Sequence, residues 1–287
     1  MIPYSFVLAT LVTLPAMAID LTSLWDFNKP EISEERFQNA IKTASPDDAL
    51  ILQTQIARTY GLRRDFAKAQ EILKKLEPHL VNASAEARVR YFIELGRTFS
   101  SAKHSPESQT TEAKEQARKA YTQAFQLAKN ERLDDLAIDA LHMQAFVDTS
   151  PLDQLKWANE ALAVVQASSQ PAAKKWEASL RNNTGYALHQ LGRYTEALPE
   201  FQRAVVLRKA EKDAQATRIA YWMEAWTLRA LNRVDEALSI QLRLERECEA
   251  AVKPDPYVFE ELELLYRLKG DKPKAVLYAE KKKALSK

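Results

Sequence analysis

Glycine is scarce in this chain. Five glycines occur in 287 residues, well below the ~7% of ordinary proteins. Because glycine supplies many of the tight turns that join short strands, an all-β fold of this length would need far more of it. The scarcity excludes a sandwich or barrel and favours helices.

Cysteine and net charge are low as well. Cys248 is the only cysteine, so no intrachain disulfide can form. We expect it to be a small buried apolar group. The 41 Lys and Arg residues nearly balance the 39 Asp and Glu residues, for a net charge of +2. A charge this small gives no general attraction to nucleic acid, which we do not expect as a partner.

Motifs of enzyme chemistry are missing from the sequence. The four histidines, His79, His104, His142 and His189, are too dispersed for a zinc motif with two ligands on adjacent helical turns. There is no Gly-rich phosphate loop, no nucleophile elbow, and no cysteine with a nearby histidine. We therefore expect no catalytic residue, no metal and no cofactor, and a protein that is not an enzyme.

Charge is absent from the N-terminal stretch, where Asp20 is the first charged residue. An apolar run over residues 5–14 is broken by Pro15 and followed by Ala16-Met17-Ala18. This order is typical of a secretory signal peptide, although no Lys or Arg precedes the apolar run. We predict that residues 1–18 are a cleaved signal peptide and that the chain is exported, to a bacterial periplasm or outside the cell. The alternative is an uncleaved membrane anchor.

Residues 19–44 are expected to form an N-terminal capping segment and a helix. Leu24, Trp25 and Phe27 lie among polar residues, and aromatics ahead of a repeat array usually fold back onto its first helices. Ser33 is the expected N-cap of the helix that follows.

What the chain does contain is a recurring interval. Small residues lie twelve positions apart, as Ala57 and Ala69, Gly185 and Ala197, and Ala225 and Ala237. In each case the first lies in a helical pattern, a turn signal follows, and the second lies in another helix. Because small residues let two helix backbones approach closely, the interval predicts an antiparallel helical hairpin used several times.

Residues that typically end or begin helices occur at positions consistent with this interval. Gly192, Asn232 and Gly270 each precede a return-helix alanine by five positions, and both residue types tolerate the left-handed conformation that ends a helix. Ser45-Pro46 and Ser150-Pro151 combine an N-cap with a first-turn proline. The sequence thus predicts about six helix pairs over residues 45–287. The second is lengthened by nine residues and the third is irregular.

The pattern resembles the tetratricopeptide repeat (TPR) family. Leu95-Gly96 followed by Phe99, and Ala197 followed by Phe201, match its signature. The resemblance covers about residues 45–287. It implies an all-α fold, a right-handed superhelical solenoid of stacked antiparallel helix pairs whose first helices line a concave groove. The family repeat is ~34 residues, whereas two steps here are 39 and 40 residues, so the helices or connections should be longer.

The groove candidates are the side chains next to the small residue of each first helix, and those one turn away. Arginine can grip a carboxylate, asparagine can bond a peptide backbone, and aromatics supply an apolar platform. We therefore predict a protein or peptide partner, acidic or bound by its C-terminus. The alternative is that the aromatics pack between helices and the arginines pair with internal acids. The candidates are Arg58, Arg97, Asn182, Tyr186, His189, Trp222, Trp226 and Arg229.

Two functions remain open from the sequence. The first is an exported scaffold that binds an extended peptide or partner protein in its groove. The second is a membrane-anchored structural component of the cell envelope that acts through self-association. A mature N-terminus at Ile19 favours the first function, and retention of Met1 favours the second.

Overall fold

The computed structural model describes residues 19–285, which form helices and turns with no strand in that range. The predicted signal peptide lies outside the described residues. A short α1 (Leu21–Leu24) and α2 (Pro30–Ile41) come first. Three short helices, η1 (Glu77–Asn82), η2 (Pro106–Ser108) and α9 (Pro171–Lys174), lie between longer ones.

The longer helices after α2 form six consecutive pairs. They are α3 (Pro46–Leu62) with α4 (Phe66–Leu76), α5 (Ala85–Phe99) with α6 (Thr111–Asn130), α7 (Asp134–Gln144) with α8 (Pro151–Ala167), α10 (Glu177–Gln190) with α11 (Tyr194–Glu211), α12 (Ala214–Ala230) with α13 (Val234–Ala250), and α14 (Pro256–Leu268) with α15 (Lys272–Leu285). The prediction of an all-α, right-handed TPR-like solenoid is confirmed.

Serine caps set the start of several helices. The Asp48 amide donates to Ser45 Oγ at 3.2 Å, with Pro46 in the first turn of α3. Ser150 caps α8 in the same way. The expectation at Ser33 was wrong, because Pro30, whose φ suits a first turn, already begins α2. The buried Ser33 hydroxyl instead accepts from the Asp26 amide and donates to the Asp26 carbonyl.

The turns inside four of the six pairs formed by the described residues use the left-handed conformation. Gly192, Asn232 and Gly270 have φ values of 72°, 59° and 75°, as their spacing predicted. Arg64 takes the same conformation in the first pair, with φ of 65°, and Arg132 takes it between the second and third pairs, with φ of 57°. A side chain tolerates this region poorly, so an arginine at these two positions did not by itself predict a left-handed residue.

Glycines mark the closest contacts within two pairs. A Cβ at Gly185 would lie 2.8 Å from the ring of Phe201, and one at Gly96 would overlap the ring of Tyr121. The aromatic ring of the return helix therefore fills the space that glycine leaves. In the second pair the extra residues form the loop 100–110, whose Ser100 carbonyl accepts a hydrogen bond from the Tyr121 hydroxyl at 2.7 Å.

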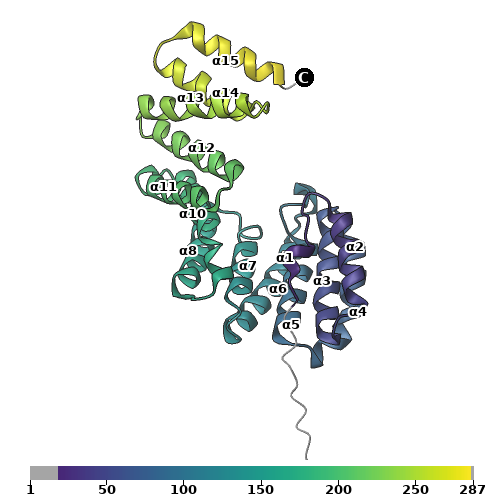
Figure 1. Cartoon of the computed structure of the whole chain (residues 1–287). Helices are drawn as coiled ribbons and strands as arrows, with labels where there is room; N and C mark the ends of the chain where they lie inside the picture. Colours follow the sequence, from purple (N-terminus) through teal and green to yellow (C-terminus); the bar gives the residue numbers. More distant parts are fainter. Residues whose placement is uncertain (1–18, 286–287) are drawn as a thin grey trace, which may run out of the picture.

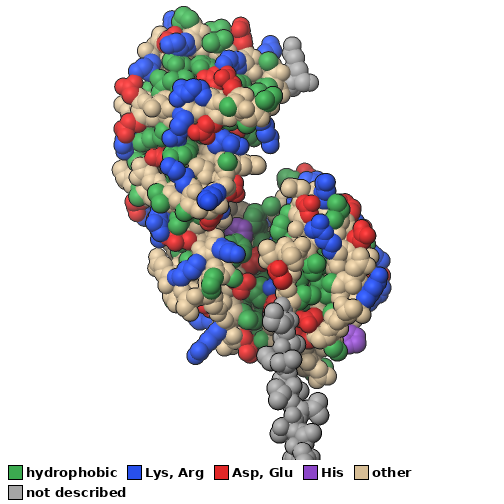
Figure 2. Space-filling model, viewed as in Figure 1, with side chains coloured by type: hydrophobic (Ala, Val, Ile, Leu, Met, Phe, Trp, Pro, Cys, Tyr) green, Lys and Arg blue, Asp and Glu red, His purple; other side chains and the backbone are tan. Residues whose placement is uncertain are grey.

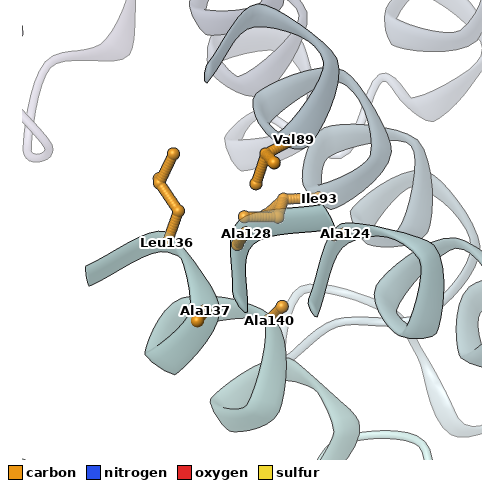
Figure 3. Close-up of a cluster of buried hydrophobic side chains, with 7 residues drawn as sticks. All are labelled: Val89, Ile93, Ala124, Ala128, Leu136, Ala137 and Ala140. Carbon is orange, nitrogen blue, oxygen red and sulfur yellow. The ribbon is translucent and has the colours of Figure 1, made fainter. Parts of the chain in front are cut away.

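The core runs along the array as a series of clusters between successive helices. Figure 3 shows one of them, where side chains of α5, α6 and α7 meet. Four of its seven members are alanines, which allow these helices to pack closely. The members are Val89, Ile93, Ala124, Ala128, Leu136, Ala137 and Ala140.

The segment before α2 folds back onto the first helices. Trp25 stacks on Phe27, with ring centroids 4.6 Å apart, and meets the buried Phe37 edge-on. The Trp25 indole donates to Gln55 Oε1 at 3.2 Å. These contacts cover the apolar side of α2 and α3 at the N-terminal end of the array.

The array as a whole is an open arch (Figure 1). Helices α2 to α6 form one limb, α12 to α15 form the other, and α7, α8 and α10 join them. Among residues 19–285, no helix is both long enough and apolar enough to cross a bilayer.

Candidate functional site

The inner side of the arch is hollowed. Figure 2 shows a recess between the two limbs, where apolar side chains lie beside charged ones. Three neighbouring hollows of about 270, 140 and 290 Å3 open along α3, α5, α7, α10 and α12. His142 of α7 lines all three, and Trp176 lines two. The three hollows together are called the groove below.

The first hollow contains a buried charge cluster. Arg97 of α5 donates two hydrogen bonds to Asp139 of α7, at 2.6 and 2.8 Å, and one to Glu94. Burial opposes the charge of Arg97, but Asp139 and Glu94 outweigh it and raise its pKa. Burial likewise opposes ionisation of Asp139, but Arg97 and Arg58 outweigh it and lower its pKa. Both groups stay ionised and hold α5 against α7.

Arg58 of α3 is held less firmly. Its guanidinium lies 5.5 and 5.3 Å from the ring centroids of Trp25 and Phe27, and 3.8 Å from Glu94 Oε1. Burial, and then the charge of Arg97, lower the pKa of Arg58. Glu94 is 3% exposed and its Oε2 has no hydrogen-bond partner among the described residues. The first hollow thus contains one loosely paired cation and one unused acceptor.

The middle of the groove contains two amides beside His142. Asn182 Oδ1 is buried without a donor in the described part of the chain. Asn183 Nδ2 lies 3.4 Å from His142 Nδ1. Trp176, between α9 and α10, packs obliquely on His142 with ring centroids 5.5 Å apart. The middle of the groove therefore offers hydrogen-bond donors and acceptors beside the Trp176 ring.

An aromatic row continues the groove along α10 and α12. Tyr186 stacks on Trp226 at 6.1 Å between centroids, and Trp226 on Trp222 at 5.8 Å. His189 also stacks on Trp226. The Trp222 indole donates to the Tyr257 carbonyl of α14 at 3.1 Å. The row joins three first helices while leaving Tyr186 40% exposed.

His189 is buried in its neutral form. The Thr227 hydroxyl already donates to the Met223 carbonyl, so His189 Nδ1–H donates to Thr227 Oγ1 over 3.0 Å. Burial, and then the charge of Arg229, lower the pKa of His189 to about 4. Arg229 itself donates to both carboxylate oxygens of Glu261, at 2.7 and 2.8 Å.

The eight predicted groove residues all lie on the first helices of their pairs. The structure pairs the three arginines with acids of neighbouring helices and packs the aromatics between helices, as the alternative interpretation required. Whether these residues contact a partner stays a prediction. Sequence reasoning missed Glu94, Asp139, His142, Trp176 and Asn183. Three of these lie in the irregular third pair or just after it, where no glycine sets the register.

The described residues contain no group of three or more His, Cys, Asp or Glu side chains placed to bind a metal ion. The acids that line the first hollow are engaged with arginines instead. The chemistry that the groove offers is hydrogen bonding, ion pairing and apolar contact.

Comparison with known proteins identifies the fold. No family profile matches the chain, and no curated protein matches it. Among solved structures, a signal-transduction ATPase of the STAND class with a tetratricopeptide repeat sensor, from Pyrococcus horikoshii, is similar with a TM-score of 0.69 and 14% identity. The match covers 89% of this chain and 39% of that one.

Two further structures are Rap proteins. The apo form of RapI matches with a TM-score of 0.69 and 12% identity, over 91% of this chain and 72% of that one. A Rap protein in complex with competence and sporulation factor matches with a TM-score of 0.55 and 11% identity, over the same shares. At these identities the likeness is one of fold, a TPR-like helical repeat.

Proposed function

We propose that the groove binds an extended peptide or a segment of a partner protein. The observation that carries the proposal is a pair of buried side-chain oxygens on the groove, Glu94 Oε2 and Asn182 Oδ1, that have no donor within residues 19–285. A buried acceptor without a donor costs roughly 1–3 kcal/mol. Main-chain N–H groups of a peptide lying along the groove would supply the missing donors.

Shape and composition support the same proposal. Solenoids of stacked helix pairs present extended concave binding surfaces. The half-exposed Tyr186 lines the groove and stacks on Trp226, so the two rings form a rigid apolar platform beside the groove, and such groups are typical anchors at interfaces. The Rap structure of similar fold was solved with competence and sporulation factor bound.

The charge of the ligand depends on which groove cations are free to pair with it. Arg97 and Arg229 are each neutralised by carboxylates, so they need no acidic ligand. Arg58, 3.8 Å from its acid, is the groove arginine best able to receive a carboxylate. An acidic or C-terminal ligand thus depends on Arg58 among the groove arginines, and the exposed Lys103 lines the same hollow.

Selection from a random peptide library against the full chain tests the proposal. Asn182→Ala removes an acceptor that has no internal partner, so folding should be retained. We expect this variant to bind the selected peptides about fivefold more weakly, because one charge-neutral hydrogen bond is worth about 1 kcal/mol. Lys119→Ala, on the exposed side of α6, is the matched control. Peptides that bind wild type and Asn182→Ala equally would contradict a site in the groove.

We also infer that the scaffold acts after export, from the pattern of residues 1–18. The experiment is N-terminal sequencing of the protein isolated from its native cells. A start at Ile19 supports export with cleavage. Retention of Met1 in a membrane fraction would support the anchored component instead.

A further inference from the structure

A separate pocket of about 530 Å3 lies between α12, the end of α13 and the start of α14. We call it the α12–α14 pocket. Of its lining residues, only Ile219 also lines a hollow of the groove. Its volume falls within the ~300–1,000 Å3 typical of small-molecule sites. It is therefore large enough for a ligand of its own, whether or not the groove binds a peptide.

The floor of the α12–α14 pocket is apolar. Leu244, Cys248 and Val258 are buried at its base, and Trp222 stands at one side. The Trp222 indole N–H is already bonded to the Tyr257 carbonyl, so the ring offers only its faces. Ile219, half-exposed at 48%, completes the apolar wall. Such a lining favours an apolar ligand body.

The rim carries two cations without a carboxylate. Within the described residues, neither the Arg218 side chain nor the Lys253 side chain has a hydrogen bond or an ion pair, in contrast to Arg229 with Glu261. Asp255, the acid of the lining, accepts from the Tyr257 amide at 2.9 Å and caps α14. The rim therefore has a net positive charge and free donors beside an apolar floor.

We propose that the α12–α14 pocket binds an apolar organic acid, with its hydrocarbon on the floor and its carboxylate between Arg218 and Lys253. Charge complementarity favours an acid, because the half-buried Arg218 guanidinium can form two charge-assisted hydrogen bonds with a carboxylate. The same chemistry is offered by a free fatty acid and by the end of an apolar peptide. The proposal does not rest on peptide binding in the groove.

Calorimetry on the full chain with decanoate tests the ligand class. The uncharged analogue is 1-decanol, and the peptide arm uses N-acetyl-Leu-Leu with a free or an amidated end. We expect decanoate to bind at least tenfold more tightly than decanol, because only the carboxylate can form an ion pair with Arg218. Binding of the free peptide acid without decanoate would assign the source to a peptide end.

Two substitutions test the rim cation and the apolar wall of the α12–α14 pocket separately. Arg218→Gln should weaken decanoate binding about tenfold and leave decanol unchanged. Ile219→Asn, at an exposed position, should weaken both. Arg246→Gln, an exposed arginine of α13 outside the lining, is the matched control and should bind as wild type does.

Cys248 gives an independent readout of occupancy. It is the only cysteine and lies on the pocket floor, so bound decanoate should slow its alkylation by N-ethylmaleimide severalfold. The proposal would be overturned if millimolar decanoate and free peptide acid gave no heat of binding and did not protect Cys248 from alkylation. Equal binding of acid and alcohol, unaffected by Arg218→Gln, would overturn it as well.

Discussion

At the scale of single residues, the charge cluster of the first hollow holds α5 against α7. Arg97 joins α5 to α7 through Asp139, 42 positions away, and through Glu94 on its own helix. A buried pair of this kind adds modest net stability, but losing one partner leaves an uncompensated charge.

Asp139→Asn should therefore destabilise the protein by about 3 kcal/mol, measured by urea unfolding. Because the pKa of Asp139 is lowered in the folded state, the stabilisation is present above about pH 4 and is lost as the pH falls further. Glu196→Gln, in an exposed pair with Arg193, is the control and should leave the midpoint unchanged. Equal midpoints for the two variants would contradict the assigned role.

His189 predicts a second pH dependence. Its folded pKa of about 4 lies below the ~6.5 of an unfolded histidine. Between these values only the unfolded chain takes up the proton, so the free energy of unfolding should fall as the pH drops from 6.5 to 4. The expected loss from this residue is on the order of 2–3 kcal/mol.

The measurement is urea unfolding at several pH values for wild type, His189→Gln and His79→Gln. His189→Gln should show a shallower decline than wild type. His79 is exposed on η1, so its substitution should leave the slope as it is. An unaltered slope in His189→Gln would mean that the buried imidazole is not the titrating group.

At the scale of elements, two glycines with opposite surroundings give a matched pair of substitutions. Gly185→Ala would bring a methyl within 2.8 Å of the Phe201 ring, and overpacking of this kind typically costs about 1–3 kcal/mol. Gly61→Ala meets nothing within 4 Å inside α3 and should stabilise by about 0.5–1 kcal/mol. Thermal unfolding compares the two. Adding Phe201→Leu to Gly185→Ala should restore part of the loss, and an absence of rescue would place the strain elsewhere.

The elements were largely predictable because their signals are local. Ser45, Ser150 and the turn residue Asn232 each act within a few positions of the chain. The short α9 and the wall residue Trp176 were missed because no small-residue interval marks them. Pairing of the arginines with internal acids was one of the two interpretations from the sequence, but the partners could not be named, since the acids lie on another helix, 32 positions away for Arg229 and Glu261. Local patterns place helices, whereas the charges between helices depend on how the pairs stack.

At the scale of the molecule, packing follows the order of the chain. Each helix contacts its neighbours in the array, and the last helix, α15, packs mainly on α14. Native-state hydrogen exchange should therefore show faster amide exchange in α15 than in α6, which packs on both α5 and α7. Uniform exchange along the chain would contradict this one-dimensional arrangement and indicate a single cooperative unit.

The curvature of an open arch of stacked helix pairs follows from the small rotation of each pair relative to the next (Figure 1). We expect small changes in these rotations to add up along the array, above all at α7, α8 and α10, which join the two limbs. We therefore expect the width of the recess in Figure 2 to depend on several of these rotations together and not on a single hinge. A ligand that contacts both limbs should bring them closer together, and a measured distance between the limbs would then report that the ligand is bound.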